Sequence, residues 1–371
     1  MEKFIISKVL FFLLLLPIVI SAKNIVIVDV GSTGSRLHIY QYQKAINQAK
    51  DFKLIATNSI SPGLSSISEG NIAPYLADLF SKKIIATLSQ AEQKLTPVYF
   101  YATAGMRLLS APEQKYYYKA VRAWLLKNTA FKIIDARTIT GQEEGVYGWI
   151  ALNFLRGFAH CQKMGLLDMG GASTQIAFLN KKYSNIKVEL NHHIYPIFSV
   201  SFLGLGQNMA ITQFSNMRAC FNKGYPLPNG ALGTGDYNQC SEQISNLLRV
   251  HHLPFNTGVL KSIRATRFNA ISGFSHVARR FDLPSKFTIK QFVSAGKKWC
   301  HRNWSSLTQA VGDQYLFRSC FSGAYQARLL TEGYGFKINS DLATNREIQG
   351  QRITWTLGVL LCHGIQCFNI H

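Results

Sequence analysis

Near its start the chain reads NIVIVDVGSTGSRLHIY (residues 24–40), an apolar run that ends on one acid, Asp29, followed by glycines, small hydroxyl residues and a second apolar run. The stretch MGLLDMGGASTQIAFLN (residues 164–180) repeats this order around Asp168, 139 positions later. Isoleucine and valine favour strands, and glycine permits the tight turn between them, so each stretch is predicted to form a β-hairpin. Because the pattern occurs twice, we expect two related α/β domains that face each other across a cleft.

The turns of the two hairpins have the composition of an anion-binding site. Glycine lets the backbone approach a ligand closely, and backbone N–H groups together with serine and threonine hydroxyls can then surround a phosphate. Arg36 adds a permanent positive charge. Asp29 and Asp168 would repel a phosphate, so these carboxylates make sense if a divalent cation lies between them and the phosphate. An ordinary pair of glycine hairpins is the alternative, which the repeated order disfavours, and the pattern is neither a Walker loop nor a G-x-G-x-x-G fingerprint.

Two further stretches are predicted to reach the same cleft. VYFYATAGMRLLS (residues 98–110) reads as a strand that enters a turn of small residues. TITGQEEGVYGWIALNFL (residues 138–155) places Glu143 and Glu144 side by side before a helix. One acid usually suffices to cap a helix, so the second one suggests a general base aimed at a water molecule. Capping remains the competing interpretation, and spacing does not choose between neighbours that point about 100° apart.

Composition limits the class of protein and the kind of partner. At 371 residues and 47% apolar content, the chain is long enough for two domains with a sizeable core, which argues against a disordered protein. Lysine and arginine number 40 against 19 acids, a net charge of +21. This excess favours anionic partners, and composition alone does not choose among nucleotides, nucleic acid and a membrane surface.

The first residues, MEKFIISKVLFFLLLLPIVISAKN, have the layout of a secretory signal peptide, with lysines before a short apolar stretch and small residues after it. We expect residues 1–22 to be cleaved after Ala22; an uncleaved anchor is the alternative. No later segment reaches the roughly 18 uninterrupted apolar residues of a membrane span. TWTLGVLLCHG (residues 354–364) is too short for one and is predicted to be a buried helix.

The seven cysteines fit an oxidising compartment. Their order suggests three disulfides that leave Cys161 free, although sequence alone leaves the connectivity open. The expected pairs are Cys220–Cys240, Cys300–Cys320 and Cys362–Cys367.

Five ordered blocks resemble the apyrases, the nucleoside triphosphate diphosphohydrolase family of ecto-nucleotidases: DVGSTGSR, YATAGMR, ITGQEEGVYGWIALN, LLDMGGASTQIAF and ITWTLG. The secondary matches SPGLSS, VSFLGLGQNMA, FNAISGF and CFSGAYQARLL extend the resemblance from about residue 24 to 360. The resemblance implies an α/β, actin-like fold of two duplicated ribonuclease-H-like domains with a central nucleotide-binding cleft. It also implies a first domain of residues 23–140 plus 346–371 and a second of 141–345.

The resemblance implies direct attack of water on the terminal phosphoryl group, assisted by Ca²⁺ or Mg²⁺, without a covalent intermediate. Glu144 corresponds to the catalytic base, and Ser173 and Gln175 to the pair that positions the water. The residues that correspond to the metal shell, mainly through bound water, are Asp29, Thr103, Glu144, Asp168 and Trp355. Those that correspond to the phosphate-binding turns are Gly31, Ser32, Thr33, Gly34, Ser35, Arg36, Gly171, Ala172 and Ser173. Those that support the site are Arg107 and Asn153.

Tyr315 is the leading candidate for contact with the nucleobase. Ser275 and His276 stand where tyrosines are common in animal members, so this part of the pattern differs. The expected substrate is ATP, ADP or another nucleoside tri- or diphosphate, with no nucleic-acid partner. A monomer is expected, secreted or periplasmic, without the C-terminal anchor of many animal members.

Two other functions compete with this one. An exopolyphosphatase of the same superfamily also carries paired Asp-Gly turns, although the YATAGMR and GQEEGVYGW blocks argue against it. A non-catalytic basic protein that binds anionic polymers is supported by the +21 charge alone. A sugar kinase is disfavoured because export would deny it cytosolic ATP.

Overall fold

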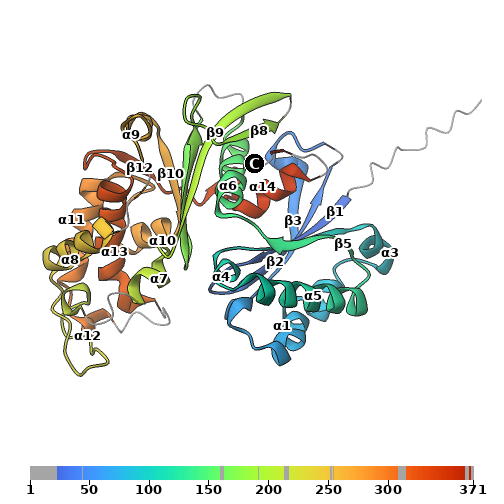
Figure 1. The fold of residues 1–371 in the computed structure, drawn as a ribbon, viewed down its shortest axis with the longest axis horizontal. Coiled ribbons are helices and arrows are strands. Elements are labelled where there is room, and N and C mark those ends of the chain that lie inside the picture. The colour runs from blue at the N-terminus through green and yellow to red at the C-terminus, as the bar shows by residue number, and fades with distance from the viewer. Residues whose placement is uncertain are drawn as a thin grey trace, which may run out of the picture.

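The computed structural model describes residues 23–43, 45–158, 163–190, 192–212, 217–250, 253, 255–307, 315–363 and 367–368. The predicted signal peptide, residues 1–22, and Cys161 lie outside these ranges. Two lobes stand side by side, each built on one β-sheet, and helices α6 (Gly141–Leu155) and α14 (Trp355–Cys362) lie between them (Figure 1).

The first lobe contains a five-stranded sheet. β1 runs parallel to β4 and β4 to β5, whereas β1, β2 and β3 form antiparallel neighbours. In spatial order the strands are β3 (Phe52–Ile60), β2 (Ser35–Tyr42), β1 (Lys23–Val30), β4 (Pro97–Ala102) and β5 (Lys132–Thr138).

The second lobe repeats this arrangement within a seven-stranded sheet. Its strands are, in spatial order, β11 (Lys286–Thr288), β12 (Asp341–Ala343), β10 (Phe268–Ser272), β6 (Gly165–Met169), β7 (Ser173–Leu179), β9 (His193–Leu203) and β8 (Ile186–Leu190). β6 pairs antiparallel with β7 and β7 with β9, while β6 pairs parallel with β10 and β10 with β12. The order β9-β7-β6-β10-β12 therefore matches β3-β2-β1-β4-β5, with β8 and β11 added at the edges. The duplication predicted from the two hairpins is confirmed.

Helices cover the outer faces of both sheets (Figure 1). The first lobe carries α1 (Ile72–Leu79), α2 (Lys82–Ile85), α3 (Gln90–Leu95), α4 (Ala104–Arg107) and α5 (Ala111–Asn128). The second carries α7 (Gln207–Thr212), α8 (Tyr237–Val250), α9 (Thr257–Ala265), α10 (Gly273–Arg280), α11 (Ile289–Cys300), α12 (Trp304–Leu307) and α13 (Ser319–Arg328). A two-stranded hairpin, β13 (Glu347–Ile348) and β14 (Gln351–Arg352), precedes α14.

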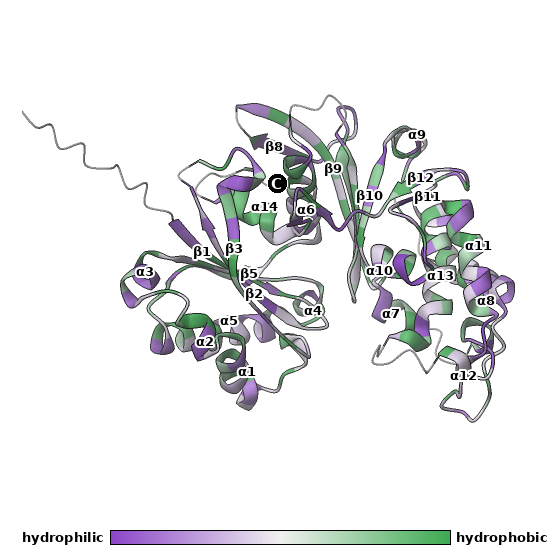
Figure 2. Ribbon diagram, turned by 180° about the vertical axis from the view of Figure 1, so that it is seen from behind, coloured by the Kyte–Doolittle hydropathy of each residue, from purple (hydrophilic) through white to green (hydrophobic). Residues whose placement is uncertain are grey.

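Three hydrophobic clusters hold these layers together. One fills each lobe on the outer side of its sheet, and a third lies between the sheets around α6 and α14. The middle cluster joins residues such as Ile25 of β1, Trp149 of α6 and Leu357 of α14, all nearly or fully buried. Figure 2 shows the contrast between apolar α14 and the hydrophilic outer helix α3. Both lobes therefore share the core in which these two helices lie.

The structure contains all three expected disulfides, Cys220–Cys240, Cys300–Cys320 and Cys362–Cys367. The last one links the end of α14 to a C-terminal segment that reaches the second lobe. There Glu189 N donates to Cys367 O over 2.7 Å, and Val188 of edge strand β8 forms an isolated bridge with Phe368. The chain thus ends by joining the helix between the lobes to the second sheet.

Among the described residues, no helix is both long and apolar enough to cross a membrane. The predicted domain boundaries fall in connections, one between β5 and α6 and the other between β12 and β13. Because α6 and α14 pack on each other and on both sheets, the assignment of either helix to one domain stays a prediction.

Removing a disulfide should destabilise the protein more when the loop that it closes is longer, with a logarithmic dependence on loop length. Cys220–Cys240 has a sequence separation of 20 and Cys362–Cys367 one of 5. The loop-entropy relation predicts losses of about 3 and about 2 kcal/mol in the free energy of unfolding for the two double alanine variants. Denaturant titration of each variant against the parent would measure this. An unchanged midpoint for Cys220→Ala/Cys240→Ala would contradict the prediction.

Candidate active site

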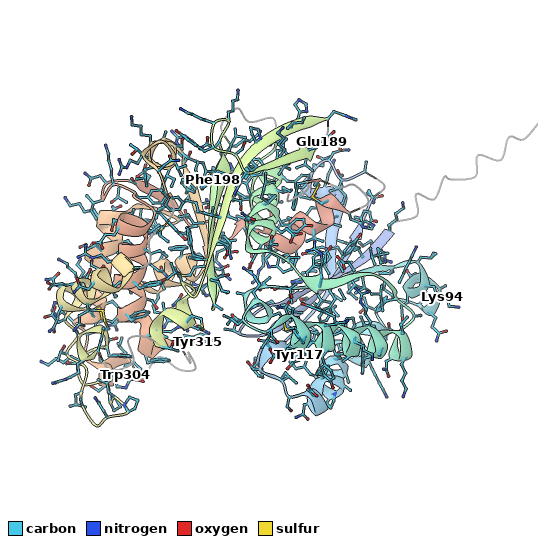
Figure 3. The ribbon with its side chains drawn as sticks, in the orientation of Figure 1. Lys94, Tyr117, Glu189, Phe198, Trp304 and Tyr315 are labelled. Atoms are coloured by element: carbon cyan, nitrogen blue, oxygen red, sulfur yellow. A yellow bond between two sulfur atoms is a disulfide. The ribbon has the colours of Figure 1, made fainter. Side chains whose placement is uncertain are left out.

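A cleft of about 760 Å³ lies between the lobes and is lined from both of them. Its inner part is formed by the turn between β1 and β2, the turn between β6 and β7, and the start of α6. Its outer part is formed by α10, Tyr315 and the segment that leads into α14. Figure 3 shows Tyr315 on the margin of the second lobe that faces the first.

The two hairpin turns have the same backbone geometry. Gly31 N donates to Gly34 O over 3.0 Å, and Gly170 N donates to Ser173 O over 2.9 Å. Each aspartate stands two residues before its turn glycine, near the end of its strand. The turns are therefore equivalent structures in the two lobes, as the repeated sequence order predicts.

The two turns approach each other and are supported closely by glycines. A Cβ added at Gly171 would lie 2.6 Å from Ser32 Oγ and 2.9 Å from Thr33 Cγ2 across the cleft. A Cβ at Gly63 would collide with the backbone of the first turn, and one at Gly206 with the backbone of the second. These three positions require glycine because another backbone or side chain occupies the space of a side chain there.

Asp29, Asp168 and Glu144 line the inner cleft together. The pKa of Asp29 is raised to about 6, mainly by burial and partly by the charge of Asp168, against the opposing effect of Arg36. The pKa of Glu144 is raised to about 7, mainly by burial and partly by the charges of Asp168 and Asp29, against the opposing effect of Arg107. Burial also raises the pKa of Asp168. Three carboxyl groups that repel one another thus share a site with little access to water.

Glu144 lies in the first turn of α6 and points toward the second hairpin. Its Oε2 accepts hydrogen bonds from Arg107 Nη2 and, over 3.2 Å, from Gln175 Nε2. Gln175 Nε2 also lies 2.7 Å from Ser173 Oγ and 3.0 Å from Ser201 Oγ. Gln175 Oε1 is buried without a hydrogen-bond partner in the structure. Such an acceptor beside a carboxylate and a serine suits a bound water molecule.

Glu143 has a different environment. Its carboxylate accepts two hydrogen bonds from Arg137, of 2.9 and 2.6 Å, and one of 2.6 Å from Thr140 N. Thr140 Oγ1 accepts in return from Glu143 N over 3.1 Å, so the two residues form a capping box at the start of α6. Glu143 is not among the residues that line the cleft.

Most residues that the sequence assigned to the site do line the cleft, including Thr103, Trp355 and Tyr315. Gly34, Ser35, Ala172, Arg107, Gln175 and Asn153 do not. Ser35 is buried beneath the first turn, where its Oγ accepts from Tyr75 OH over 2.7 Å. Asn153 bonds Met164 N and O over 2.9 and 3.0 Å, which ties the end of α6 to the strand that carries Asp168. Ser35 and Asn153 therefore act on the cleft only through the elements that they hold.

The donor set of the inner cleft consists of oxygen atoms from carboxylates and hydroxyls, which suits a hard cation such as Ca²⁺ or Mg²⁺. Within the described ranges, no three His, Cys, Asp or Glu side chains lie close enough to hold a metal ion together. The water-mediated shell of a divalent ion at these residues stays a prediction.

Three functional positions were missed as site residues. Ser201 of β9 contacts Gln175, and Ser272 hydrogen-bonds Asp168 with its side chain. Ser272 has a φ of 54°, a conformation that side chains rarely adopt. Asn208 of α7 donates its N–H to Gly171 O over 2.8 Å and supports the second turn. All three residues belong to stretches that match the family pattern, and these matches could have pointed to them. Ser201 and Asn208 lie in VSFLGLGQNMA, and Ser272 lies in FNAISGF.

Two duplicated ribonuclease-H-like sheets around a shared cleft define an actin-like α/β protein. The chain belongs to the GDA1/CD39 (nucleoside phosphatase) family, which it matches over residues 20–368. It is therefore a hydrolase, and the predicted resemblance is confirmed.

Its relatives are similar over most of their length. Ectonucleoside triphosphate diphosphohydrolase 1 of Mus musculus is 29% identical, covering 93% of this chain and 81% of the relative. Probable apyrase 3 of Arabidopsis thaliana is 26% identical, covering 91% and 81%. Among solved structures, a nucleoside triphosphate hydrolase from Neospora caninum aligns with a TM-score of 0.68 at 16% identity, covering 92% of each chain. A Ppx/GppA protein of Aquifex aeolicus aligns with a TM-score of 0.56 at 15% identity, covering 92% and 97%. The two solved structures confirm the fold.

The stability of the metal-free protein should depend on pH through the crowded carboxyl groups. The pKa values of Asp29 and Glu144 rise from 3.8 and 4.5 to about 6 and about 7. Such groups stabilise the fold at low pH and lose that contribution as pH rises through the folded-state pKa. We expect the free energy of unfolding to be higher at pH 5 than at pH 8 by about 2–4 kcal/mol from these two groups.

Urea titrations at both pH values in EDTA would measure this difference. The variant Asp29→Asn/Glu144→Gln isolates the two groups, and its stability should change much less between pH 5 and pH 8. Calcium should restore the stability of the parent protein at pH 8. An equal pH dependence in parent and variant would show that other groups are responsible.

Proposed function

We propose that this protein is a nucleoside triphosphate diphosphohydrolase, or apyrase, that removes the terminal phosphate of nucleoside tri- and diphosphates, with ATP the foremost substrate. The observation that carries the proposal is the meeting of two equivalent phosphate-type turns with Asp29, Asp168 and Glu144 in one cleft. The named activities of the mouse and Arabidopsis relatives support the same substrate class.

The two turns would bind the phosphate chain from opposite sides. Gly31, Ser32 and Thr33 face it from the first lobe, and Gly170, Gly171 and Ser173 from the second. Their backbone N–H groups and hydroxyls suit phosphate oxygens. Gly171 approaches the first turn closely, so the space between the turns is narrow. The phosphate chain of the nucleotide would be held there in line for attack by water.

Asp29 and Asp168 would hold a divalent cation, mainly through its bound waters. When bound, such an ion neutralises charge on the phosphates and on the leaving group. It would also offset the repulsion between the carboxylates of Asp29 and Asp168, which contributes to the raised pKa of Asp29. We propose calcium or magnesium as this ion.

Glu144 would act as the general base. Its pKa of about 7 places proton acceptance close to neutral pH, where a base is most effective. Ser173 and Gln175 would hold the water, since Gln175 contacts both Glu144 and Ser173. Attack by that water would break the terminal phosphoanhydride bond in one step, releasing inorganic phosphate and the shortened nucleotide.

We also propose that the protein is exported after loss of residues 1–22. The three disulfides support an oxidising compartment, secreted or periplasmic. The N-terminal residue of the mature chain would test this, and an intact Met1 on a cytosolic protein would contradict it.

Phosphate release tests the proposed function directly. The purified protein should release phosphate from ATP or ADP with Ca²⁺ or Mg²⁺ present and lose nearly all activity in excess EDTA, because the carboxylates cannot approach phosphate without a cation. Inorganic polyphosphate as the sole substrate distinguishes an exopolyphosphatase, and absence of release from both substrates supports a non-catalytic binding protein. Full activity in EDTA would contradict the metal-assisted mechanism.

Glu144→Gln keeps size and hydrogen bonding but cannot accept a proton. We expect turnover of ATP to fall about 10²–10⁴-fold with little change in nucleotide affinity, since the turns and the cation hold the substrate. Glu143→Gln is the matched control and should stay within about tenfold, because Glu143 pairs with Arg137 and caps α6. Turnover numbers of variants with equal thermal stability would decide. An inactive Glu143→Gln beside an active Glu144→Gln would reverse the assignment of the base.

A further inference from the structure

The outer part of the cleft is unusually rich in arginine. The side chains come from three different parts of the fold, namely β2, the α10 to α13 region and the segment before α14. We call them the arginine wall: Arg36, Arg279, Arg280, Arg318, Arg346 and Arg352. Among the described residues that line the cleft, the acids are Asp29, Glu144 and Asp168, and all three belong to the inner site.

Some members of the wall have counter-charges or polar partners. Arg36 Nη1 lies 3.4 Å from Asp29, Arg352 Nε lies 3.5 Å from exposed Glu347, and Arg318 donates to Asn208. Arg279 and Arg346 differ from these. In the part of the chain that the structure describes, neither has an ion pair or a side-chain hydrogen bond. Their guanidinium groups therefore have N–H donors available to a ligand, although the charge of Glu347 acts on Arg346.

The charges of the wall act on one another. Burial lowers the pKa of Arg346, Arg279 and Arg352 add to this effect, and the neighbouring charge of Glu347 opposes it. Partial desolvation and the charges of Arg346, Arg279 and Arg280 together lower the pKa of His276 to about 4. Like charges gathered in this way attract an anion.

Arg279 and Arg346 belong to the outer part of the cleft and not to the two phosphate-type turns. Arg279 and Arg280 end α10, and Arg318 stacks on Tyr315, the candidate base contact, at 4.0 Å from its ring centroid. Residues of α10 line the same cleft as Tyr315 and Arg318. The phosphates would lie further in, between the two turns. With the reacting phosphate between the turns, the positive charge of Arg279 and Arg346 would then face the nucleoside end of the substrate.

We propose that Arg279 and Arg346, with His276 beside them, form a second phosphate-binding subsite, which takes a phosphate group on the ribose of the nucleotide. This inference rests on the proposed function, because it assumes that the nucleotide lies with its reacting phosphate at Glu144. The substrate class is then a nucleoside 5′-di- or triphosphate that carries a further phosphate on its sugar. That group is bound and is not hydrolysed.

The chemistry of the wall suits this ligand. A phosphate monoester carries close to two negative charges at pH 7 and accepts paired hydrogen bonds from guanidinium groups. Arginine is better suited to this geometry than lysine. Among the described residues that line the cleft there are six arginines and no lysine. Two charge-assisted contacts that plain ATP cannot make predict a preference of about tenfold or more in kcat/KM.

The test compares ATP with its 2′-phosphorylated and 3′-phosphorylated derivatives in the presence of Mg²⁺. The parent protein should hydrolyse at least one derivative with kcat/KM about tenfold above that of ATP. Arg279→Gln/Arg346→Gln should abolish this preference, to within about twofold, and leave kcat/KM for ATP nearly unchanged. Lys119→Gln/Lys187→Gln is the matched control, since it removes two exposed charges on α5 and β8, away from the cleft, and should retain the preference.

Several outcomes would overturn the inference. Equal use of ATP and both derivatives by the parent would do so, as would an equal loss of preference in the lysine control, which would indicate general charge attraction. An equal gain with adenosine 5′-tetraphosphate would assign the wall to a longer phosphate chain instead of the sugar. Failure to hydrolyse ATP at all would instead refute the proposed function, so the two failures are distinguishable.

Discussion

Three carboxyl groups held close together in a buried cleft are the constraint on which the rest of the molecule depends. Asp29 comes from the first sheet, Asp168 from the second and Glu144 from the helix between them. Burial raises the pKa of each one, and repulsion from neighbouring carboxylates adds to the rise for Asp29 and Glu144, so their proximity is unfavourable by itself. Two strand ends and a helix start must therefore be fixed by packing elsewhere.

The middle hydrophobic cluster provides that fixation. α6 carries Glu144 at its first turn, and α14 carries Trp355 at its start, so both helices bring a cleft residue from the shared core. Gly358 of α14 lies so close to the backbone of Tyr147 that a Cβ would collide with it. The two helices thus pack in direct backbone contact. A small shift of either would move Glu144 or Trp355 relative to the turns.

The duplicated lobes have diverged at equivalent positions. Asp29 lies opposite Arg36 in the first hairpin, and Asp168 lies opposite Gln175 in the second. The first partner supplies a charge that opposes the rise in the pKa of Asp29. The second supplies an amide that contacts Glu144 and Ser173. One lobe therefore contributes an opposite charge at this position, and the other contributes a neutral amide that links Glu144 to Ser173.

Sequence alone determined the two hairpins, their glycine turns and the general order of the fold, because these depend on local residue preferences and on a repeat visible along the chain. It also placed Glu143 and Glu144 together at a helix start but could not separate them. Tertiary structure assigned Glu143 to Arg137 and Glu144 to the cleft, since that choice depends on which partner each side chain meets.

The arginine wall likewise exists only in three dimensions. Arg279 and Arg346 are far from Arg36 along the chain and, unlike Arg36, look like ordinary surface charges in the sequence. Packing of the two lobes around α6 and α14 brings them to one cleft, because contacts between distant segments are set by the topology of the sheets and not by local preference. For the same reason the sequence could not exclude Ser35, which belongs to the first glycine turn, from the phosphate-binding residues. In the structure Ser35 is buried beneath that turn and hydrogen-bonded to Tyr75.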